Sequence, residues 1–204
     1  MTDNKEKVVS VYAEANPNPE SMKFVMNVQL LPEGQSVDYP NLESALESPL
    51  AQELFNFDYV SRVFIASNFV TVTKDTNLEW VKLIPELRTF LKSYTEAGGP
   101  AFKEGFEANK KAEAIDGTGE ATAEDTAISQ KVIDLLENYV RPAVEQDGGN
   151  ITFKSYNDGV VTVHLQGSCS GCPSATVTLK AGIENLLKRM VPEVKEVVAD
   201  GVTV

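Results

Sequence analysis

A stretch from Lys103 to Ala127 divides the chain, because it contains almost no large apolar side chains. Phe106 and Ile115 are the exceptions in a run of mainly Ala, Glu, Gly, Thr and Lys. Such a segment cannot bury enough apolar surface to offset the entropy lost when it is ordered. We therefore expect a flexible acidic linker over 103–127, which joins one domain over 1–102 to a second over 128–204. The expected fold class is α+β, with two small mixed domains.

The first of these domains alternates strand and helix signals. The expected elements are a half-buried strand over 21–30, a helix over 42–55 that restarts at Pro49, a hairpin over 60–73 and a helix from Asp75 to Tyr94. The hairpin is predicted because two β-branched and aromatic runs flank the dipeptide Ser67-Asn68. Asp75 is the expected capping residue of the last helix.

The second domain is predicted to have the order α-β-β-α-β. Its first helix carries an apolar stripe that consists of Val132, Leu135, Leu136, Tyr139 and Val140, and Pro142 ends or restarts it. Strands over 151–156 and 159–166 flank an Asn-Asp-Gly turn at 157–159. A helix over 174–190 follows, with an apolar face that consists of Leu179, Ile183, Leu186, Leu187 and Met190, and a strand over 195–199 ends the order. The polar run from Asp147 to Asn150 is interpreted as a turn before a strand.

The chain has two cysteines, Cys169 and Cys172, in a short Gly/Ser loop between a strand and a helix. Pro173 suits the first helical position, where its missing N–H has no partner to lose. Free backbone N–H groups at a helix start favour a thiolate at Cys172. Gly167 and Gly171 let the backbone approach a ligand closely. We expect this loop to be exposed and to bind zinc, copper(I) or an iron–sulfur cluster through soft thiolates.

The number of ligands in one chain is too small for such a site. Zinc sites and iron–sulfur clusters normally take four protein ligands, and this chain offers two cysteines and one histidine, His164. Val161, Val163 and Leu165 are expected on one face of their strand, which leaves His164 on the more polar face. Two copies of the chain, placed across a two-fold axis, would supply four thiolates. We therefore expect a cluster bridging a homodimer.

Two alternatives remain open at this point. A dithiol redox protein would use the same cysteine pair without iron, although no aromatic residue precedes the pair and the α-β-β-α-β order differs from that of thioredoxin. A structural zinc dimer would use the same four thiolates. Nothing in the sequence indicates a hydrolase, because phosphate-binding glycine loops and a paired nucleophile and base are lacking.

The net charge of −12 argues against nucleic acid and anionic membranes as partners, because both attract basic surfaces. About −10 of this charge precedes residue 128, so the first domain is the better candidate for electrostatic selection of partners. Two close cysteines fit a reducing compartment. The first residues contain neither an apolar stretch after a basic start nor arginine, which predicts a cytoplasmic location.

The second domain resembles the NifU C-terminal (Nfu) type, and the first resembles the Nfu N-terminal domain. The matching strings are VRPAVEQDGGNITF from Val140, LQGSCSGCPSATVTLKAGIENLL from Leu165, VPEV from Val191, NPNPESMKF from Asn16, ESPLAQELF from Glu47 and NFVTVTKD from Asn68. This resemblance implies a non-enzymatic carrier that binds a [4Fe-4S] cluster between two subunits through Cys169 and Cys172 and passes it to apo-proteins. A [2Fe-2S] cluster stays open. The extra cysteine-rich domains of the larger nitrogen-fixation scaffolds are missing here, which favours delivery over assembly.

Overall fold

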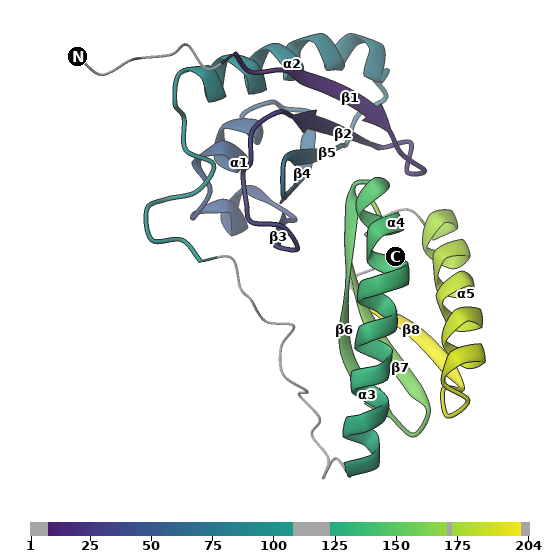
Figure 1. Ribbon diagram of the computed structural model, residues 1–204. Coiled ribbons are helices and arrows are strands. Elements are labelled where there is room, and N and C mark those ends of the chain that lie inside the picture. Colours follow the sequence, from purple (N-terminus) through teal and green to yellow (C-terminus); the bar gives the residue numbers. More distant parts are fainter. Residues whose placement is uncertain (1–7, 108–122, 171–172, 201–204) are drawn as a thin grey trace. The chain divides into compact units, whose positions relative to one another are not determined.

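The chain forms two compact units, Met1–Ala108 and Asn109–Val204, in a computed structural model that describes residues 8–107, 123–170 and 173–200. Each unit combines helices with one β-sheet, so the chain is α+β as predicted (Figure 1). The stacked rings of Phe102 and Phe106 pack against the core of the first unit, and helix α3 (Ala123–Leu135) begins inside the range expected to be a linker. Both ends of 103–127 therefore belong to the folded units. The domain limits at 102 and 128 stay a proposal.

The first unit is built on an antiparallel sheet with the strand order β1-β2-β5-β4-β3. Its elements are β1 (Val11–Ala15), β2 (Ser21–Met26), β3 (Ser36–Tyr39), the 3₁₀ turn η1 (Leu42–Ala45), α1 (Pro49–Leu54), β4 (Val60–Ala66), β5 (Phe69–Lys74) and α2 (Trp80–Glu96). Leu54, Leu87 and Leu91 of the two helices share one core with Phe24 and Val70 of the sheet. The β4–β5 hairpin and the helix that starts at Pro49 are confirmed.

Strand β2 is buried along its whole length, so the prediction of a half-buried strand is wrong. It lies inside the sheet, between β1 and β5, and its two faces join different apolar clusters. Phe24 belongs to the main core, whereas Val25 groups with Phe64, Ala66 and Phe69. The edge strands β1 and β3 were not predicted, because each is short and carries polar residues that weaken the alternation.

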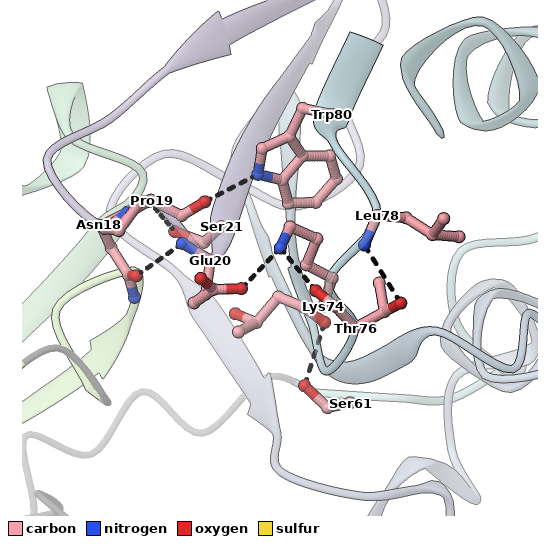
Figure 2. A network of polar contacts seen from close by, with 10 residues as sticks. Asn18, Pro19, Glu20, Ser21, Ser61, Lys74, Thr76, Leu78 and Trp80 are labelled. Atoms are coloured by element: carbon pink, nitrogen blue, oxygen red, sulfur yellow. Dashed lines mark hydrogen bonds and ion pairs between the residues drawn. The ribbon is translucent and has the colours of Figure 1, made fainter. Parts of the chain in front are cut away.

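A polar network fastens the start of α2 to strands β2 and β5 (Figure 2). The Lys74 Nζ donates hydrogen bonds to Glu20 Oε2 at 2.6 Å and to the Thr76 carbonyl at 2.9 Å. The indole Nε1 of Trp80 donates to the Pro19 carbonyl at 2.9 Å. Because the Lys74 side chain is only 8% exposed, these bonds keep a largely buried cation satisfied.

Asp75 is not the helix cap that we predicted, because α2 begins later in the chain. Residues 75–79 are irregular, with a bend at 76–77, and α2 begins only at Trp80, after Glu79, whose side chain makes no capping bond. The backbone N–H of Asp75 donates to the Tyr59 carbonyl instead, which extends the pairing of β4 and β5. Pro85 lies inside the helix.

Replacing Lys74 with methionine is expected to lower the free energy of unfolding of the first unit by about 1–2 kcal/mol, through the lost charged hydrogen bonds. Urea unfolding followed by the fluorescence of Trp80, the single tryptophan, measures this change. The matched control is Lys92→Met, because Lys92 lies 3.9 Å from Glu96 and is 51% exposed. It should cost less than about 0.5 kcal/mol. Equal costs for the two variants would contradict a stabilising role for the network.

The second unit places its helices on one face of the three-stranded sheet β6-β7-β8 (Figure 1). Its elements are α3 (Ala123–Leu135), a π-helical segment η2 (Leu136–Val140), α4 (Arg141–Gln146), β6 (Gly149–Asn157), β7 (Val160–Gly167), α5 (Pro173–Met190) and β8 (Glu196–Asp200). Strand β8 pairs parallel with β7, and α5 makes the crossover between them. The α-β-β-α-β order is therefore confirmed, with its first helix restarted near Pro142.

Two residues of the predicted apolar stripes lie outside the core. Tyr139 is 66% exposed, because the π-helical segment inserts a residue and turns Val140 into the core position. Met190 is 52% exposed at the last position of α5. Val132, Leu136 and Val140 are buried as predicted, and Ile128 and Val144 extend the buried stripe of the first helix.

The β6–β7 hairpin contains a β-bulge that shifts its register. Phe153 pairs with Val163, whereas Ser155 pairs with Thr162, so the register shifts by one residue at Lys154. The hairpin turns at Asp158, with φ 48°, and Gly159, with φ 89°, the conformation expected for an Asn-Asp-Gly turn. Beyond the bulge, the ladder ends with Gly149 opposite Gly167.

Candidate functional site

The candidate site is the loop Ser168-Cys169-Ser170, which leaves the end of β7 just before α5 begins at Pro173. Gly167 has a φ of 66°, a conformation that favours glycine, and it turns the chain out of the strand. The backbone N–H and the hydroxyl of Ser170 both donate to the Gly167 carbonyl, at 3.1 and 2.9 Å. These bonds close a tight turn around Cys169.

A second segment, Asp147-Gly148-Gly149, contacts this loop from the end of α4. Gly148 ends the helix with a φ of 79°. The Ser168 N–H donates to the Gly148 carbonyl at 3.3 Å, and the Ser168 Oγ donates to the Asp147 carbonyl at 2.5 Å. The segment is a turn before a strand, as predicted, and it also supports the cysteine loop. The sequence alone did not indicate that this segment contacts the cysteine loop.

Cys169 is buried, so the prediction of an exposed loop is wrong for the described part of it. The side chain belongs to the apolar core of the second unit, the residue is 8% exposed, and its Sγ lies 3.8 Å from the Ser168 Oγ. Burial raises the pKa of the Cys169 thiol to about 11, and the contact with Ser168 opposes this rise. The thiol is therefore neutral at pH 7, and it becomes a good ligand when a metal displaces its proton.

Cys172 and Gly171 lie outside the described residues. The predicted roles of Cys172 as a ligand and as a thiolate at a helix start therefore stay predictions, as does the role of Gly171. The start of α5 at Pro173 is the part of that prediction that the structure confirms.

His164 lies on the sheet face opposite to the core that contains Cys169. Along β7 the buried residues are Val161, Val163 and Leu165, and His164 alternates with them. Among residues 8–107, 123–170 and 173–200, no group of three or more His, Cys, Asp or Glu side chains could hold a metal ion. The soft thiolate chemistry of the loop fits an iron–sulfur cluster, but one chain supplies only two thiols. No helix in the described ranges is both long and apolar enough to cross a bilayer.

Comparisons with known proteins match both units. Residues 11–98 match the family described as "Scaffold protein Nfu/NifU N terminal", and residues 132–198 match the "NifU-like domain". The chain is 37% identical over 192 residues to "NFU1 iron-sulfur cluster scaffold homolog, mitochondrial" of Drosophila willistoni, covering 94% of this chain and 64% of that protein. It is 39% identical over 202 residues to "NifU-like protein 4, mitochondrial" of Arabidopsis thaliana, covering 95% and 66%.

The chain thus spans about two thirds of the length of these curated relatives. A solution NMR structure of a NifU-like protein from Saccharomyces cerevisiae matches with a TM-score of 0.43 and 22% identity, covering 51% of this chain and 92% of that one.

The prediction of a cytoplasmic location is contradicted by these relatives. Both proteins carry mitochondrial names, which point to a mitochondrial rather than a cytoplasmic location. The composition of the first residues and the reducing environment that fits two close cysteines do not distinguish between reducing compartments, which is why the location was predicted wrongly.

Proposed function

Because this chain belongs to the Nfu family of iron–sulfur cluster scaffold proteins, we propose that it carries a [4Fe-4S] cluster as cargo and delivers it to apo-proteins. Cys169 and Cys172 are the proposed ligands. The protein would be a carrier rather than an enzyme, since the cluster is bound and released without a chemical change of a substrate.

The observation that carries this proposal is the small number of soft ligands around Cys169. Four thiolates hold a [4Fe-4S] cluster, and the whole sequence contains two cysteines. His164 lies on the opposite face of the sheet from Cys169, which makes it unsuitable as a third ligand. A second copy of the chain, with its own pair of cysteines, supplies the two missing thiolates. A homodimer is therefore part of the proposal.

Two bonds per subunit also suit the release of the cargo. A cluster shared between two subunits can be freed by their separation, whereas four ligands from a single chain would have to be broken within one fold. The apo-proteins that receive the cluster would complete its coordination with their own thiolates. Delivery then becomes an exchange of equivalent ligands between partners.

The pKa of Cys169 weighs against the dithiol redox alternative. An attacking thiol in a disulfide reductase has a pKa near or below neutrality, which gives a reactive thiolate. Burial instead raises the pKa of Cys169 to about 11. A thiol of this kind is a slow nucleophile at pH 7.

The proposed function is tested by anaerobic reconstitution with ferrous iron and sulfide, followed by analysis of iron, acid-labile sulfide and native mass. We expect about four irons and four sulfides per two chains. The loaded species should have twice the 22.2 kDa chain mass plus the cluster. Mixing it with an apo iron–sulfur protein should move the cluster to that acceptor. A fully loaded monomer without an external thiol would refute the shared site, and two irons per two chains would indicate a [2Fe-2S] cargo.

A further inference from the structure

Gly149 lies closer to the Cys169 thiol than any residue with a side chain could. A Cβ added at Gly149 would lie 2.9 Å from the Cys169 Sγ, 3.3 Å from the Ser168 Oγ and 2.6 Å from the Gln166 carbonyl oxygen. All three distances are too short for ordinary van der Waals contact. The space beside Gly149 is therefore already filled, by the Gln166 carbonyl oxygen and by the Cys169 thiol.

The reason for glycine at this position is space rather than backbone conformation. Gly148, with φ 79°, and Gly159, with φ 89°, adopt the left-handed conformation that favours glycine. Gly149 is not among the glycines with positive φ, and it pairs with Gly167 as a regular member of β6. Its distinguishing feature is the close approach of the Gln166 carbonyl and of the Cys169 thiol.

Ser168 closes the other side of the same space. Its hydroxyl donates to the Asp147 carbonyl at 2.5 Å and lies 3.8 Å from the Cys169 Sγ. Its backbone N–H donates to the Gly148 carbonyl, which joins the loop to the segment that carries Gly149. Ser168 is 2% exposed, so it is itself buried in the interior of the second unit.

We propose that Gly149 is a positioning residue for Cys169, and that Gly149 and Ser168 form a seat which stores the thiol when the cluster is absent. The consequence for the cargo rests on the proposed function. A thiol packed in the core of one subunit cannot contact iron that is shared with another subunit, so Cys169 leaves the seat when the cluster binds. Occupation of the seat and ligation of the cluster are therefore alternative states of one side chain.

The seat is tested on cluster-free protein by alkylation with iodoacetamide. In a Cys172→Ser background Cys169 is the single thiol, so the alkylation rate reports the exposure and ionisation of this one side chain. The methyl group of Gly149→Ala meets both the Gln166 carbonyl and the thiol, and the thiol is the one that can leave by a side-chain rotation, so this variant should raise the rate on the order of tenfold or more. Gly182→Ala is the matched control, because nothing lies within 4 Å of a Cβ added there, and the rate should stay within about twofold. An unchanged rate in folded Gly149→Ala protein overturns the seat.

A second pair of variants separates the seat from general destabilisation. Ser168→Ala opens the seat without adding volume. Loss of the Ser168 contact also favours the protonated thiol, so the severalfold higher alkylation rate expected in this variant would report increased exposure. Val161→Ala removes buried volume from β7 at a residue that is 0% exposed, away from the loop. It should lower the free energy of unfolding without changing native-state alkylation. If Val161→Ala accelerates alkylation as much as Ser168→Ala does, the effect is structural and the seat is wrong.

The outcome for the seat is distinguishable from the outcome for the proposed function. If the alkylation rates change as expected but wild-type protein takes up no cluster, the seat stands and the carrier function fails. If wild-type protein loads normally but Gly149→Ala and Ser168→Ala leave alkylation unchanged, the carrier function stands and the seat fails.

Discussion

Replacing Cys169 with serine is expected to lower the iron retained after anaerobic reconstitution from about four atoms per two chains to less than one. A serine hydroxyl stays protonated and is a hard oxygen donor, whereas iron–sulfur clusters select soft thiolates. In a homodimer the substitution removes two of the four thiols, because each copy of the chain loses one of its two cysteines. Iron and acid-labile sulfide in desalted protein give the measurement, and Cys172→Ser should give the same result.

The matched control for this variant is His164→Gln. It removes the single histidine of the sequence, from the opposite face of β7, and should leave the iron content unchanged. Because Cys169 is 8% exposed, a hydroxyl in its place should cost about 1–2 kcal/mol of unfolding free energy. Urea unfolding of the cluster-free variant separates this cost from the loss of a ligand. Normal loading of folded Cys169→Ser protein would show that another group ligates the iron.

Replacing Leu165 with alanine is expected to lower the free energy of unfolding of the second unit by about 3 kcal/mol. Leu165 is 0% exposed and lies in β7 opposite Ile151, at the centre of the only core of that unit in the described residues. A domain of this size has a total stability of about 5–10 kcal/mol, so the loss is a large fraction of it. The far-UV circular dichroism signal in urea should show an earlier transition.

Two controls assign this effect to the core of the second unit. Val177→Ala truncates an apolar side chain of α5 that is 68% exposed, and it should change stability by less than about 0.5 kcal/mol. The fluorescence of Trp80, which lies in the first unit, should keep its wild-type transition in Leu165→Ala protein. A loss similar to that of Val177→Ala would contradict the description of Leu165 as a core residue.

Strong local signals made much of the second unit predictable. The Asn-Asp-Gly turn required positive φ at 158 and 159, and the structure places the β6–β7 hairpin there. Alternation along β7 separated Val163 and Leu165 from His164 correctly. Pro173 marked the start of α5, because a residue without a backbone N–H loses nothing at that position.

Other features depend on tertiary contacts that leave no local pattern. Tyr139 continued the apolar spacing of its helix, but a π-helical segment changes the spacing and exposes it. The burial of Cys169 depends on Gly149 and Ser168 packing around it, and a Gly/Ser loop by itself suggested exposure.

The role of Gly149 was hidden by the β-bulge in β6. Counting back from the turn along a regular ladder pairs Gly149 with Ser168, which is one residue away from its observed partner, Gly167. A shift of one residue reverses the face of every side chain in the strand. The position of Gly149 beside the thiol therefore depends on the β-bulge, which the sequence pattern does not predict.

The bulge at Lys154 separates the two ends of the hairpin. Deletion of Lys154 would leave a regular ladder in which Phe153 still faces Val163 and Ser155 still faces Thr162. The glycine pair beside the thiol would keep its partners, since the surplus residue lies between that pair and the turn. Homologous hairpins that differ in length by this residue can therefore keep the same pairing of the two glycines beside the thiol. An alignment with such chains should be anchored on Gly149 and Gly167 and should place its gap at position 154.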